Sequence, residues 1–437
     1  MPERIYKDSA YNIDMYRGKD GRILIYNGAY GKTAWFTPTV YSGFRNKSDI
    51  AQSDTTAELI HNKFIVPQEY DEFGRLMIKR EKLLHDPHPS SMEMTIATTS
   101  ACNMHCVYCF EEGCSIETMS DNTERLTVEY IINSLRENNN CKSFHISWYG
   151  GEPLLDVNRI VGISRKVIDF CKDKGIKYSA SLITNGLLLS ADVAEYLRTE
   201  CCVFNAQVSI DGLAKTYSKQ KRTPEESFYT VIKNIKEASA YIKIDVRINT
   251  TKHNANEIIP LFHLLFDENP QNITAYIAIV REYNGIDVEG LFESLEYEKL
   301  KRTILKQLVI DGFINRLHIR LGAGLLPCTN LKQSYALIGP DGHLYTCLNH
   351  LGRSELSIGD VSIGFYGNEL SRYYKNDPLP DKCSKCYLFP ACSGLCPDNR
   401  RNGVIECSSE AIKYRLETQF YLALVGKGII AVEDMPD

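Results

Sequence analysis

The spacing of apolar and polar positions changes along the chain and separates three kinds of segment. From residue 92 onward, short apolar runs alternate with longer stretches in which apolar residues recur every three or four positions. The first pattern is typical of strands and the second of amphipathic helices. Six such strand–helix units in succession predict a parallel sheet with helices outside it, and a ligand site at the carboxyl ends of the strands.

The fold class predicted for this central region is α/β. The expected strands are Met94–Thr98, Phe144–Tyr149, Tyr178–Thr184, Phe204–Ile210, Ile242–Asn249 and Ile273–Val280. The expected helices between them include Thr123–Arg136, Asn158–Cys171, Ala191–Leu197, Ser227–Ala240 and Glu257–Phe266.

The two ends of the chain have different patterns. Near the N-terminus, strands at Ile23–Tyr26 and Thr33–Phe36 flank the turn signal Asn27-Gly28, and a helix around Thr55–His61 precedes a strand at Lys63–Pro67. These elements predict a small winged-helix-like module. From about Gly324 the chain is rich in Cys, Gly and Pro, which is typical of a loop-rich domain held by metal. The predicted division is therefore 1–90, 91–290, a helical bridge at 291–323, and 324–437.

Composition narrows the function classes. The net charge of −5 gives no overall attraction to nucleic acid or to an anionic membrane, and no apolar run is long enough to span a bilayer. The first residues lack the apolar core of a signal peptide, so a cytoplasmic location is expected. Fifteen cysteines in a reducing compartment point to metal ligation, and ten of them fall into two groups.

The first group is a short loop after the first strand, with Cys102, Cys106 and Cys109 separated by three and then two residues. Three thiolates can hold three irons of a [4Fe–4S] cubane, and the fourth iron is left open to the amino and carboxylate groups of a small molecule. A structural zinc site requires four ligands, and His105 inside the loop is the alternative that would supply the fourth.

This C-x3-C-x2-C loop resembles that of the radical SAM superfamily, whose members cleave S-adenosylmethionine (SAM) to a carbon radical. The resemblance extends over residues 92–280 and implies a partial (β/α)6 barrel. It implies that the three cysteines bind a [4Fe–4S] cluster and that Tyr108 lies beside the adenine. It also implies that the turn Gly150-Gly151-Glu152-Pro153 contacts the SAM amino group; two glycines allow close backbone approach, and a carboxylate or carbonyl pairs with an ammonium.

Polar residues at later strand ends are further candidates for SAM contacts by the same resemblance. They are Thr184, Asn185, Ser209 and Arg247. Strand ends also favour caps and turns, so a structural role is the alternative for each of them. Lys221-Arg222 falls in a loop that often carries a basic residue in the family, but a solvated charge pair is the favoured interpretation. No catalytic residue is predicted.

The second group of cysteines resembles the SPASM domain of radical SAM peptide-modifying enzymes. Cys328 and Cys347 form a C-x13-G-x4-C element around Gly342, and five more cysteines follow. The resemblance implies two auxiliary [4Fe–4S] clusters and thus three in all. The distal cluster would be held by Cys383, Cys386, Cys392 and Cys407, and the nearer one by Cys328, Cys347 and Cys396. A zinc ribbon is the alternative for the Cys383–Cys386 pair alone.

The nearer cluster has three identified cysteines, and the sequence offers no fourth. Either one iron is open to a thiol, or a group such as His318 or Asp341 completes the site. The other cysteines are expected to be structural thiols, although Cys114 follows the cluster loop; they are Cys114, Cys141, Cys171, Cys201 and Cys202.

The leading functional hypothesis is a maturase that oxidatively cross-links residues of a ribosomally made precursor peptide. The N-terminal module resembles domains that bind the leader of such a precursor by strand addition, and a flavodoxin or ferredoxin is the expected reductant. One alternative is a sulfatase-maturing enzyme, against which Leu348 after Cys347 counts. Another is a non-catalytic iron–sulfur electron carrier. The precursor, the residues joined, the bond type (thioether, carbon–carbon or ether) and the oligomeric state stay open.

Overall fold

The computed structural model describes residues 6–45, 54–319, 324–403 and 407–436. Its backbone forms two compact units. Unit 1 combines Met1–His85, Ile319–Thr329 and Asp377–Pro436, and unit 2 combines Asp86–His318 with Asn330–Asn376. The N-terminal segment and the cysteine-rich C-terminal segment therefore share one unit. The predicted division into four domains stays a prediction.

Unit 2 is built on a ten-stranded sheet in which six consecutive strands of the chain lie side by side and parallel. They are β6 (Ser91–Ala97), β7 (Ser143–Tyr149), β8 (Lys177–Thr184), β9 (Val203–Ser209), β10 (Lys243–Thr250) and β11 (Ile273–Ile279). Beyond β6 the sheet continues with β12 (Ala336–Ile338), β13 (His343–Tyr345), β14 (Gly359–Asp360) and β15 (Gly364–Phe365). The predicted α/β class with a parallel, barrel-like sheet is confirmed.

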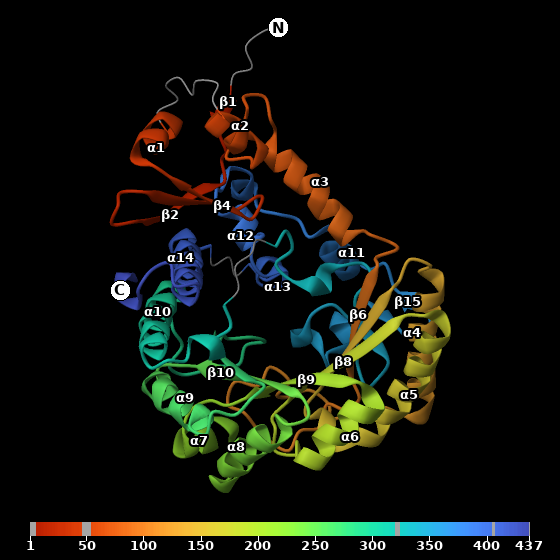
Figure 1. The fold of residues 1–437 in the computed structure, drawn as a ribbon. Helices are drawn as coiled ribbons and strands as arrows, with labels where there is room; N and C mark the ends of the chain where they lie inside the picture. The colour runs from red at the N-terminus through yellow and green to blue at the C-terminus, as the bar shows by residue number, and fades with distance from the viewer. Residues whose placement is uncertain (1–5, 46–53, 320–323, 404–406, 437) are drawn as a thin grey trace. The chain divides into compact units, whose positions relative to one another are not determined.

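Helices pack along the outer side of the parallel strands (Figure 1). They are α4 (Asp121–Glu137), α5 (Val157–Lys174), α6 (Ala191–Cys201), α7 (Ala214–Lys221), α8 (Glu226–Ala238), α9 (Ile258–Phe266) and α10 (Ser294–Ile310), and α11 (Glu369–Asn376) follows later. Strand β7 shows the reason for this arrangement: Phe144, Ile146 and Trp148 are completely buried, whereas the alternate residues are half-buried. Side chains alternate between the two faces of a strand, so the apolar set lies under the helices and the polar set faces the concave interior.

Capping residues fix where several of these helices begin and end. The side chain of Ser120 accepts a hydrogen bond from the N–H of Thr123 at the start of α4, and Ser190 does the same for Val193 at the start of α6. Helix α5 ends at Gly175, whose φ of 68° lies in the left-handed region that favours glycine. These local signals place the strand ends, and hence the site, at defined positions.

Unit 1 contains two small antiparallel sheets. The larger consists of β2 (Asn12–Arg17), β3 (Ile23–Asn27) and β4 (Lys32–Phe36), and the smaller pairs β1 (Tyr6–Asp8) with β5 (Ile65–Pro67). Its helices are α1 (Pro38–Arg45), α2 (Asp54–His61), α3 (Glu72–Leu84), α12 (Phe389–Cys392), α13 (Pro397–Arg401) and α14 (Ser409–Gly426). The three strands and the helix expected for the N-terminal module are present.

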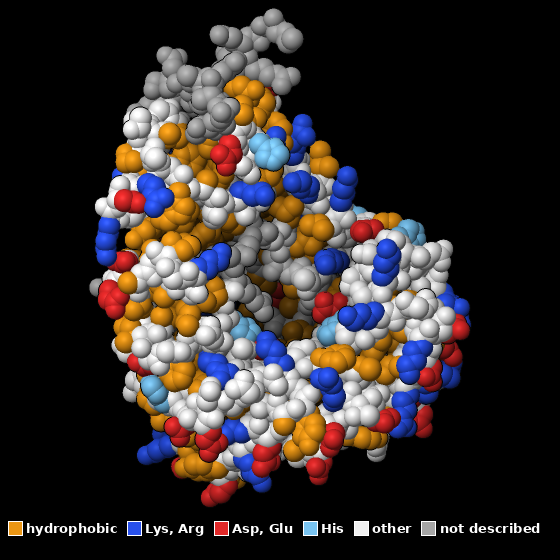
Figure 2. All heavy atoms as spheres, viewed as in Figure 1, with side chains coloured by type: hydrophobic (Ala, Val, Ile, Leu, Met, Phe, Trp, Pro, Cys, Tyr) orange, Lys and Arg blue, Asp and Glu red, His pale blue; other side chains and the backbone are white. Residues whose placement is uncertain are grey.

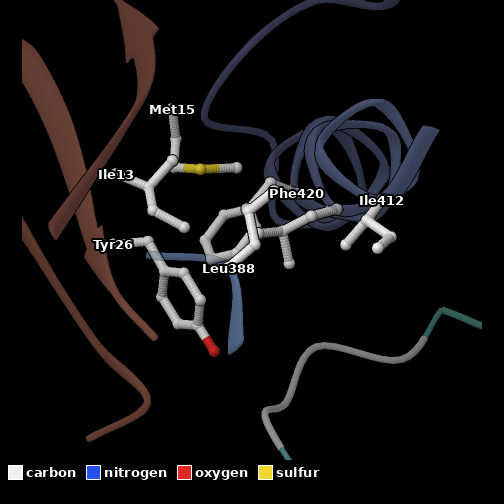
Figure 3. Close-up of a cluster of buried hydrophobic side chains, with 7 residues drawn as sticks. Ile13, Met15, Tyr26, Leu388, Ile412 and Phe420 are labelled. Atoms are coloured by element: carbon white, nitrogen blue, oxygen red, sulfur yellow. The ribbon is translucent and has the colours of Figure 1, made fainter. Parts of the chain in front are cut away.

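Both faces of the three-stranded sheet are covered within unit 1. One face packs on residues of α1, α2 and β5. The other packs on α14 and the residue before α12: Figure 3 shows Ile13, Met15 and Tyr26 against Leu388, Ile412 and Phe420. The rings of Tyr26 and Phe420 lie with centroids 4.6 Å apart. Helix α14 is therefore part of the core of the N-terminal module, and in the described part of the chain only the edges of this sheet remain for a further strand.

The surface agrees with the modest net charge. Figure 2 shows acidic and basic side chains interspersed over the helices of unit 2 on the visible face. Within the described part of the chain, no helix combines the length and the hydropathy that crossing a membrane requires. The cytoplasmic location stays a prediction.

Candidate functional site

A cavity of about 330 Å³ in unit 2 lies at the carboxyl ends of the parallel strands. Tyr149, Thr184, Ser209 and Asn249 line it from the ends of β7, β8, β9 and β10, which is where parallel sheets hold ligands. The cysteine loop forms another wall. The sequence-predicted residues that line it are Cys102, Cys106, Tyr108, Cys109, Gly150, Gly151, Thr184, Asn185 and Ser209.

The three cysteines of the loop come together in the cavity. Burial raises the pKa of the Cys102 thiol to about 11, and the neighbouring Cys106 adds to the rise. Burial likewise raises the pKa of Cys109 to about 12, with contributions from Glu111, Cys106 and Cys102. The backbone N–H groups of Met104 and Glu111 donate hydrogen bonds to the sulfurs of Cys102 and Cys109. Three clustered sulfurs with N–H donors fit a cationic iron–sulfur core, which would reverse these shifts by deprotonating the thiols.

Helix α7 holds the cysteine loop from the other side. The N–H of His105 donates to the carbonyl of Lys221 at 3.1 Å, and the N–H of Val107 donates to the carbonyl of Gln220 at 2.9 Å. His105 itself is exposed. The apolar pattern of the sequence does not predict α7, and so gives no indication of this support for the loop.

The two glycines of the Gly-Gly-Glu-Pro turn are required by the chain itself. A Cβ atom on Gly150, whose φ is 130°, would lie 2.2 Å from the carbonyl oxygen of Thr99. A Cβ on Gly151 would lie 2.4 Å from the carbonyl oxygens of both Ser100 and Ala101. The turn therefore presses against the backbone that leads into the cysteine loop, and no larger residue fits without moving that backbone.

Glu152 is completely buried and does not line the cavity. Its carboxylate accepts hydrogen bonds from the N–H of Leu154 at 3.0 Å, the hydroxyl of Thr184 at 2.7 Å and the N–H of Asn185 at 2.8 Å. Burial raises its pKa, and these donors oppose the rise. Glu152 thus ties the turn after β7 to the end of β8, and its predicted contact with SAM stays a prediction.

Asn185 connects the end of β8 to the cysteine loop. Its side-chain nitrogen donates to the side-chain oxygen of Asn103 at 2.6 Å and lies 3.9 Å from the sulfur of Cys102. Its side-chain oxygen accepts from the N–H of Leu187 at 3.0 Å. The residue therefore positions the loop, whatever it contributes to a ligand.

A buried polar network surrounds Tyr108. The Tyr108 hydroxyl donates to Asp211 and accepts from the ammonium of Lys221 at 2.8 Å and from the side chain of Asn249 at 3.1 Å. Lys221 also pairs with Asp211 at 3.0 Å and donates to Ser209 at 2.8 Å. Burial, assisted by the Asp211 carboxylate, raises the pKa of Tyr108 well above its usual value.

The interpretation of Lys221-Arg222 as a solvated charge pair was wrong for Lys221. The Lys221 side chain is 2% exposed, whereas the Arg222 side chain is 54% exposed and pairs with Glu112 at 3.5 Å. Arg222 caps α7 with a φ of 48°, so the two adjacent side chains diverge. The lysine can be buried because Asp211, whose side chain is 0% exposed in the turn between β9 and α7, neutralises it.

The surroundings of two further groups were not expected from the sequence. Arg247 does not line the cavity; its guanidinium donates to Asn249 at 2.8 Å and lies over the ring of Tyr276, and its predicted contact with SAM stays a prediction. Conversely, Glu111 lines the cavity and shares a hydrogen bond with Tyr149, and burial raises its pKa to about 7. The sequence carried no signal for Glu111, because this loop residue meets Tyr149 at the end of β7, about 40 positions later in the chain.

Unit 1 contains a second set of clustered thiols. The thiols of Cys392, Cys386 and Cys407 all lie near enough to Cys383 to raise its pKa, although burial is the main cause. The sulfur of Cys392 accepts hydrogen bonds from the N–H groups of Gly394 and Leu395. These N–H groups point to the sulfur because residues 393, 394 and 395 all have left-handed φ angles, of 57°, 91° and 68°. Four sulfurs with such a pair of backbone donors fit an anionic metal–thiolate centre.

The three cysteines predicted for the nearer cluster belong to different units: Cys328 and Cys396 to unit 1 and Cys347 to unit 2. Their joint role stays a prediction. The two proposed alternatives for a fourth ligand have other partners within unit 2. His318 contacts Asp245 at 3.0 Å and Thr274 at 2.7 Å, and Asp341 accepts from the N–H of His343 and the hydroxyl of Tyr345, both at 3.1 Å.

The remaining cysteines are thiols in mostly structural surroundings. Cys171 and Cys201 are completely buried. Cys141 and Cys202 are half-buried. Cys114 is half-buried and lines the cavity, with its sulfur 3.8 Å from the carbonyl oxygen of Leu351. None of the fifteen cysteines, all of which lie in the described ranges, forms a disulfide.

Comparison with known proteins gives consistent matches. Residues 96–265 match the model of the Radical SAM superfamily. A probable GTP 3′,8-cyclase of Methanocaldococcus jannaschii is 34% identical over 274 residues, which are 58% of this chain and 84% of that protein. The radical SAM cyclopropyl synthase TigE of Paramaledivibacter caminithermalis is 22% identical over 410 residues, which are 84% of this chain and 81% of TigE.

Solved structures share the fold over most of the chain. The structure of anSMEcpe with bound AdoMet and the Kp18Cys peptide has a TM-score of 0.58 and 17% identity, and the match covers 79% of this chain and 100% of that one. Streptococcus suis SuiB bound to the precursor peptide SuiA has a TM-score of 0.53 and 14% identity, and the match covers 91% of this chain and 97% of SuiB.

Proposed function

Because the chain belongs to the radical SAM superfamily, we propose that it is a maturase that oxidatively cross-links residues of a ribosomally made precursor peptide. The observation that carries this proposal is the combination of a three-thiol cavity at the strand ends with a separate four-thiol centre in unit 1. A single open cluster suffices to cleave SAM, whereas further clusters suit a reaction in which the substrate loses electrons overall.

Membership of the family implies a [4Fe–4S] cluster and SAM, and Cys102, Cys106 and Cys109 are the residues that would hold the cluster. When bound, cluster and SAM together supply a 5′-deoxyadenosyl radical that abstracts a hydrogen atom from the substrate. The chain contributes the rigid rim around them. Lys221 and Asp211 fix Tyr108, Asn185 fixes the loop at Cys102, and the glycine turn closes against the loop backbone.

The proposal includes two auxiliary clusters, with Cys383, Cys386, Cys392 and Cys407 holding the distal one and Cys328, Cys347 and Cys396 contributing to the nearer one. Three cubanes require ~12 irons per chain. We expect replacement of Cys383 and Cys386 by Ala to remove about a third of the iron, since each of three cubanes carries the same number of irons. Unchanged iron content in that double variant would reject the distal cluster. Cys141→Ala, another half-buried cysteine, is the matched control and should lose none.

The fold and the relatives support a peptide as the substrate. SuiB, which shares the fold over 91% of the chain, was solved with a precursor peptide. The name of TigE supports carbon–carbon bond formation among the bond types that the sequence leaves open. A sulfatase-maturing activity is not proposed, because Leu348 follows Cys347, whereas those enzymes carry an aspartate close to the corresponding cysteine. The physiological reductant in this proposal is a flavodoxin or ferredoxin.

The leader of the precursor would bind at the edge strand β4. Both faces of the three-stranded sheet are covered, and among the described residues no strand pairs with the outer edge of β4. A groove of about 280 Å³ runs between β4 and α14, lined in part by Thr33, Trp35 and Ile429. Figure 2 shows hydrophobic side chains gathered over this part of unit 1. An extended peptide can add to such an edge while its apolar side chains enter the groove.

Deleting the N-terminal module is not a clean test of leader binding, because its strands share a core with α14. Thr33→Glu places a charge in the groove and should weaken precursor affinity by at least several-fold in a fluorescence anisotropy titration. Lys32→Glu is the control on the same strand. It changes the net charge by two, whereas Thr33→Glu changes it by one, but Lys32 does not line the groove. The precursor affinity of the Lys32→Glu variant should therefore stay near that of the wild type. Equal affinities for both variants would reject this leader site.

The activity test uses the anaerobically reconstituted protein with SAM, dithionite and small peptides encoded beside its gene. We expect 5′-deoxyadenosine to form and one peptide to lose two hydrogens per cross-link, detected by mass spectrometry. Replacing Cys102, Cys106 and Cys109 together by Ala should abolish both. SAM cleavage retained by this triple variant, or cleavage without any loss of hydrogen from a peptide, would refute the radical site or the maturase proposal, respectively.

A further inference from the structure

Unit 1 contains two arginines and one aspartate that are almost completely withdrawn from water. The side chains of Arg80, Asp377 and Arg400 are 3%, 0% and 4% exposed, and Asp377 pairs with both arginines. Arg80 comes from α3, Arg400 from α13, and Asp377 from the segment after α11, with a left-handed φ of 39°. Two positive charges and one negative charge leave one net positive charge in the interior. An unbalanced buried charge is costly unless an anion lies nearby.

Two anionic groups neighbour this network: the exposed carboxylate of Glu81, one residue after Arg80 on α3, and the four-thiol centre. Cys383 is among the groups that raise the pKa of Arg80, and Arg400 is among those that lower the pKa of Cys383. Burial and then Arg400 lower the pKa of Arg80 to about 10, so the guanidinium is still charged at neutral pH.

Arg400 also holds the backbone beside the centre. Its guanidinium donates to the carbonyl oxygen of Gly394 at 2.5 Å. Gly394 lies in the left-handed loop whose N–H groups point to the sulfur of Cys392. Arg80 donates to the carbonyl of Leu325 in another segment of the unit. The network therefore acts on the thiol centre in two ways: through its positive charge, and through the hydrogen bond from Arg400 that holds the backbone at Gly394.

We propose that the Arg80–Asp377–Arg400 network raises the reduction potential of the cluster held by Cys383, Cys386, Cys392 and Cys407. This inference rests on the proposed function, because it takes the four-thiol centre to hold a [4Fe–4S] cluster. A cubane with four thiolates is an anion, and uptake of one electron makes it more negative. A net positive charge in a dry interior stabilises the reduced form more than the oxidised form.

The experiment compares variants of the reconstituted full chain in a dithionite titration monitored by electron paramagnetic resonance. Dithionite supplies the single electron, and no bond is made or broken in the protein. The signal of the distal cluster is identified as the one that is absent from the Cys383→Ala, Cys386→Ala double variant. Iron content and the thermal unfolding of each iron-free variant are measured in parallel.

Two substitutions change the buried charge in opposite directions. Arg80→Met removes a positive charge and should shift the midpoint potential to more negative values. Asp377→Asn removes the negative charge and should shift it to more positive values; asparagine tolerates a left-handed φ, so the backbone is preserved. Arg75→Met is the matched control, because Arg75 is an exposed arginine on the same helix, and its midpoint should equal that of the wild type.

Shifts of opposite sign with full iron content support the inference. Unchanged midpoint potentials, or shifts of the same sign in Arg80→Met and Asp377→Asn, overturn it. An electrostatic effect must change sign with the charge that is removed, whereas distortion of the loop need not. If Arg80→Met does not fold, Arg80→Lys keeps the charge and should retain the wild-type midpoint, and Asp377→Asn carries the test of sign. Unchanged iron content in the double cysteine variant is a different result, which rejects the proposed distal cluster itself.

Discussion

Replacing Lys221 by Met tests whether the network around Tyr108 supports the cysteine loop. The substitution keeps a side chain of similar length and leaves the Asp211 carboxylate buried without its cation. Removing one partner of a buried ion pair costs about 3–5 kcal/mol. Asp211 keeps the hydroxyl of Tyr108 and the N–H of Asn249 at 3.2 Å as donors. These bonds offset part of the cost, so we expect a loss of about 3 kcal/mol in the stability of unit 2.

The adjacent Arg222 provides the control. Arg222→Met removes an equally positive charge, but its pair with Glu112 is 3.5 Å long and both side chains are 54% exposed. Exposed pairs contribute less than about 1 kcal/mol. The two variants therefore separate burial from charge at neighbouring positions.

Intrinsic fluorescence can report the two units separately, because the chain has only two tryptophans. Trp148 is completely buried in β7 of unit 2, and Trp35 belongs to β4 of unit 1. In a Trp35→Phe background, urea unfolding followed at Trp148 measures the stability of unit 2. Lys221→Met should unfold at a clearly lower urea concentration than Arg222→Met.

The pH dependence adds a second check on Lys221. Burial acts to lower its pKa, but Asp211, Cys106 and Tyr108 outweigh burial and raise the pKa well above its usual value. For a base whose pKa is raised on folding, the stabilisation is complete below the unfolded pKa of ~10.4 and is lost only as the pH rises through the folded value. The difference between wild type and variant should thus stay constant from about pH 6 to 9. A difference that vanishes at pH 8, or equal unfolding of Lys221→Met and Arg222→Met, would refute the reasoning.

Three further predictions follow from single positions. Gly151→Ala should abolish 5′-deoxyadenosine formation, because the new Cβ would lie 2.4 Å from two carbonyl oxygens. Gly162→Ala is the control and should retain the activity, because the atom nearest to its Cβ is the end of the flexible Glu124 side chain, at 3.2 Å. Equal turnover by the two variants would contradict this prediction. Asn27→Ala should destabilise unit 1 by about 2–3 kcal/mol, measured at Trp35 in a Trp148→Phe background, because it removes a buried donor to three oxygens. Burial lowers the pKa of His145, so unit 2 should lose stability as the pH falls through ~6.5, and His145→Gln should reduce that loss in acid unfolding curves.

The parallel strands were predictable because their burial is extreme. Each of the six strands carries completely buried apolar residues, and the turns between the elements carry capping residues and glycine. Helix α7 was missed for the opposite reason. Its sequence is mostly polar, and only Tyr217, Gln220 and Lys221 are buried in it. The helix is positioned by its own carbonyls, which accept from the cysteine loop more than 100 residues earlier in the chain, and no local pattern encodes such a contact.

The spacing of the cysteines predicted that they group into metal sites, but it did not predict which other residues surround those sites. A positive residue beside Cys383 could not be inferred from a chain in which Arg80 precedes that cysteine by about 300 positions. The same limit applies to unit 1 as a whole. The apolar residues of α14 indicate a buried helix, yet nothing in them identifies Ile13, Met15 and Tyr26 as the residues they meet. Sequence patterns specify which faces are apolar, and only the tertiary fold specifies which faces pair.

The structure also changes how the Gly-Gly-Glu-Pro turn is understood. The glycines are needed because the turn touches the backbone of residues 99–101, and the glutamate is needed because it joins the ends of two strands. Asn185, in turn, connects the second of those strand ends to Cys102. The motif residues are therefore consecutive links from the sheet to the cysteine loop. The loop and the turn are already joined by hydrogen bonds and by close packing. A ligand that contacts both therefore binds to a preorganised site and loses little free energy in ordering it.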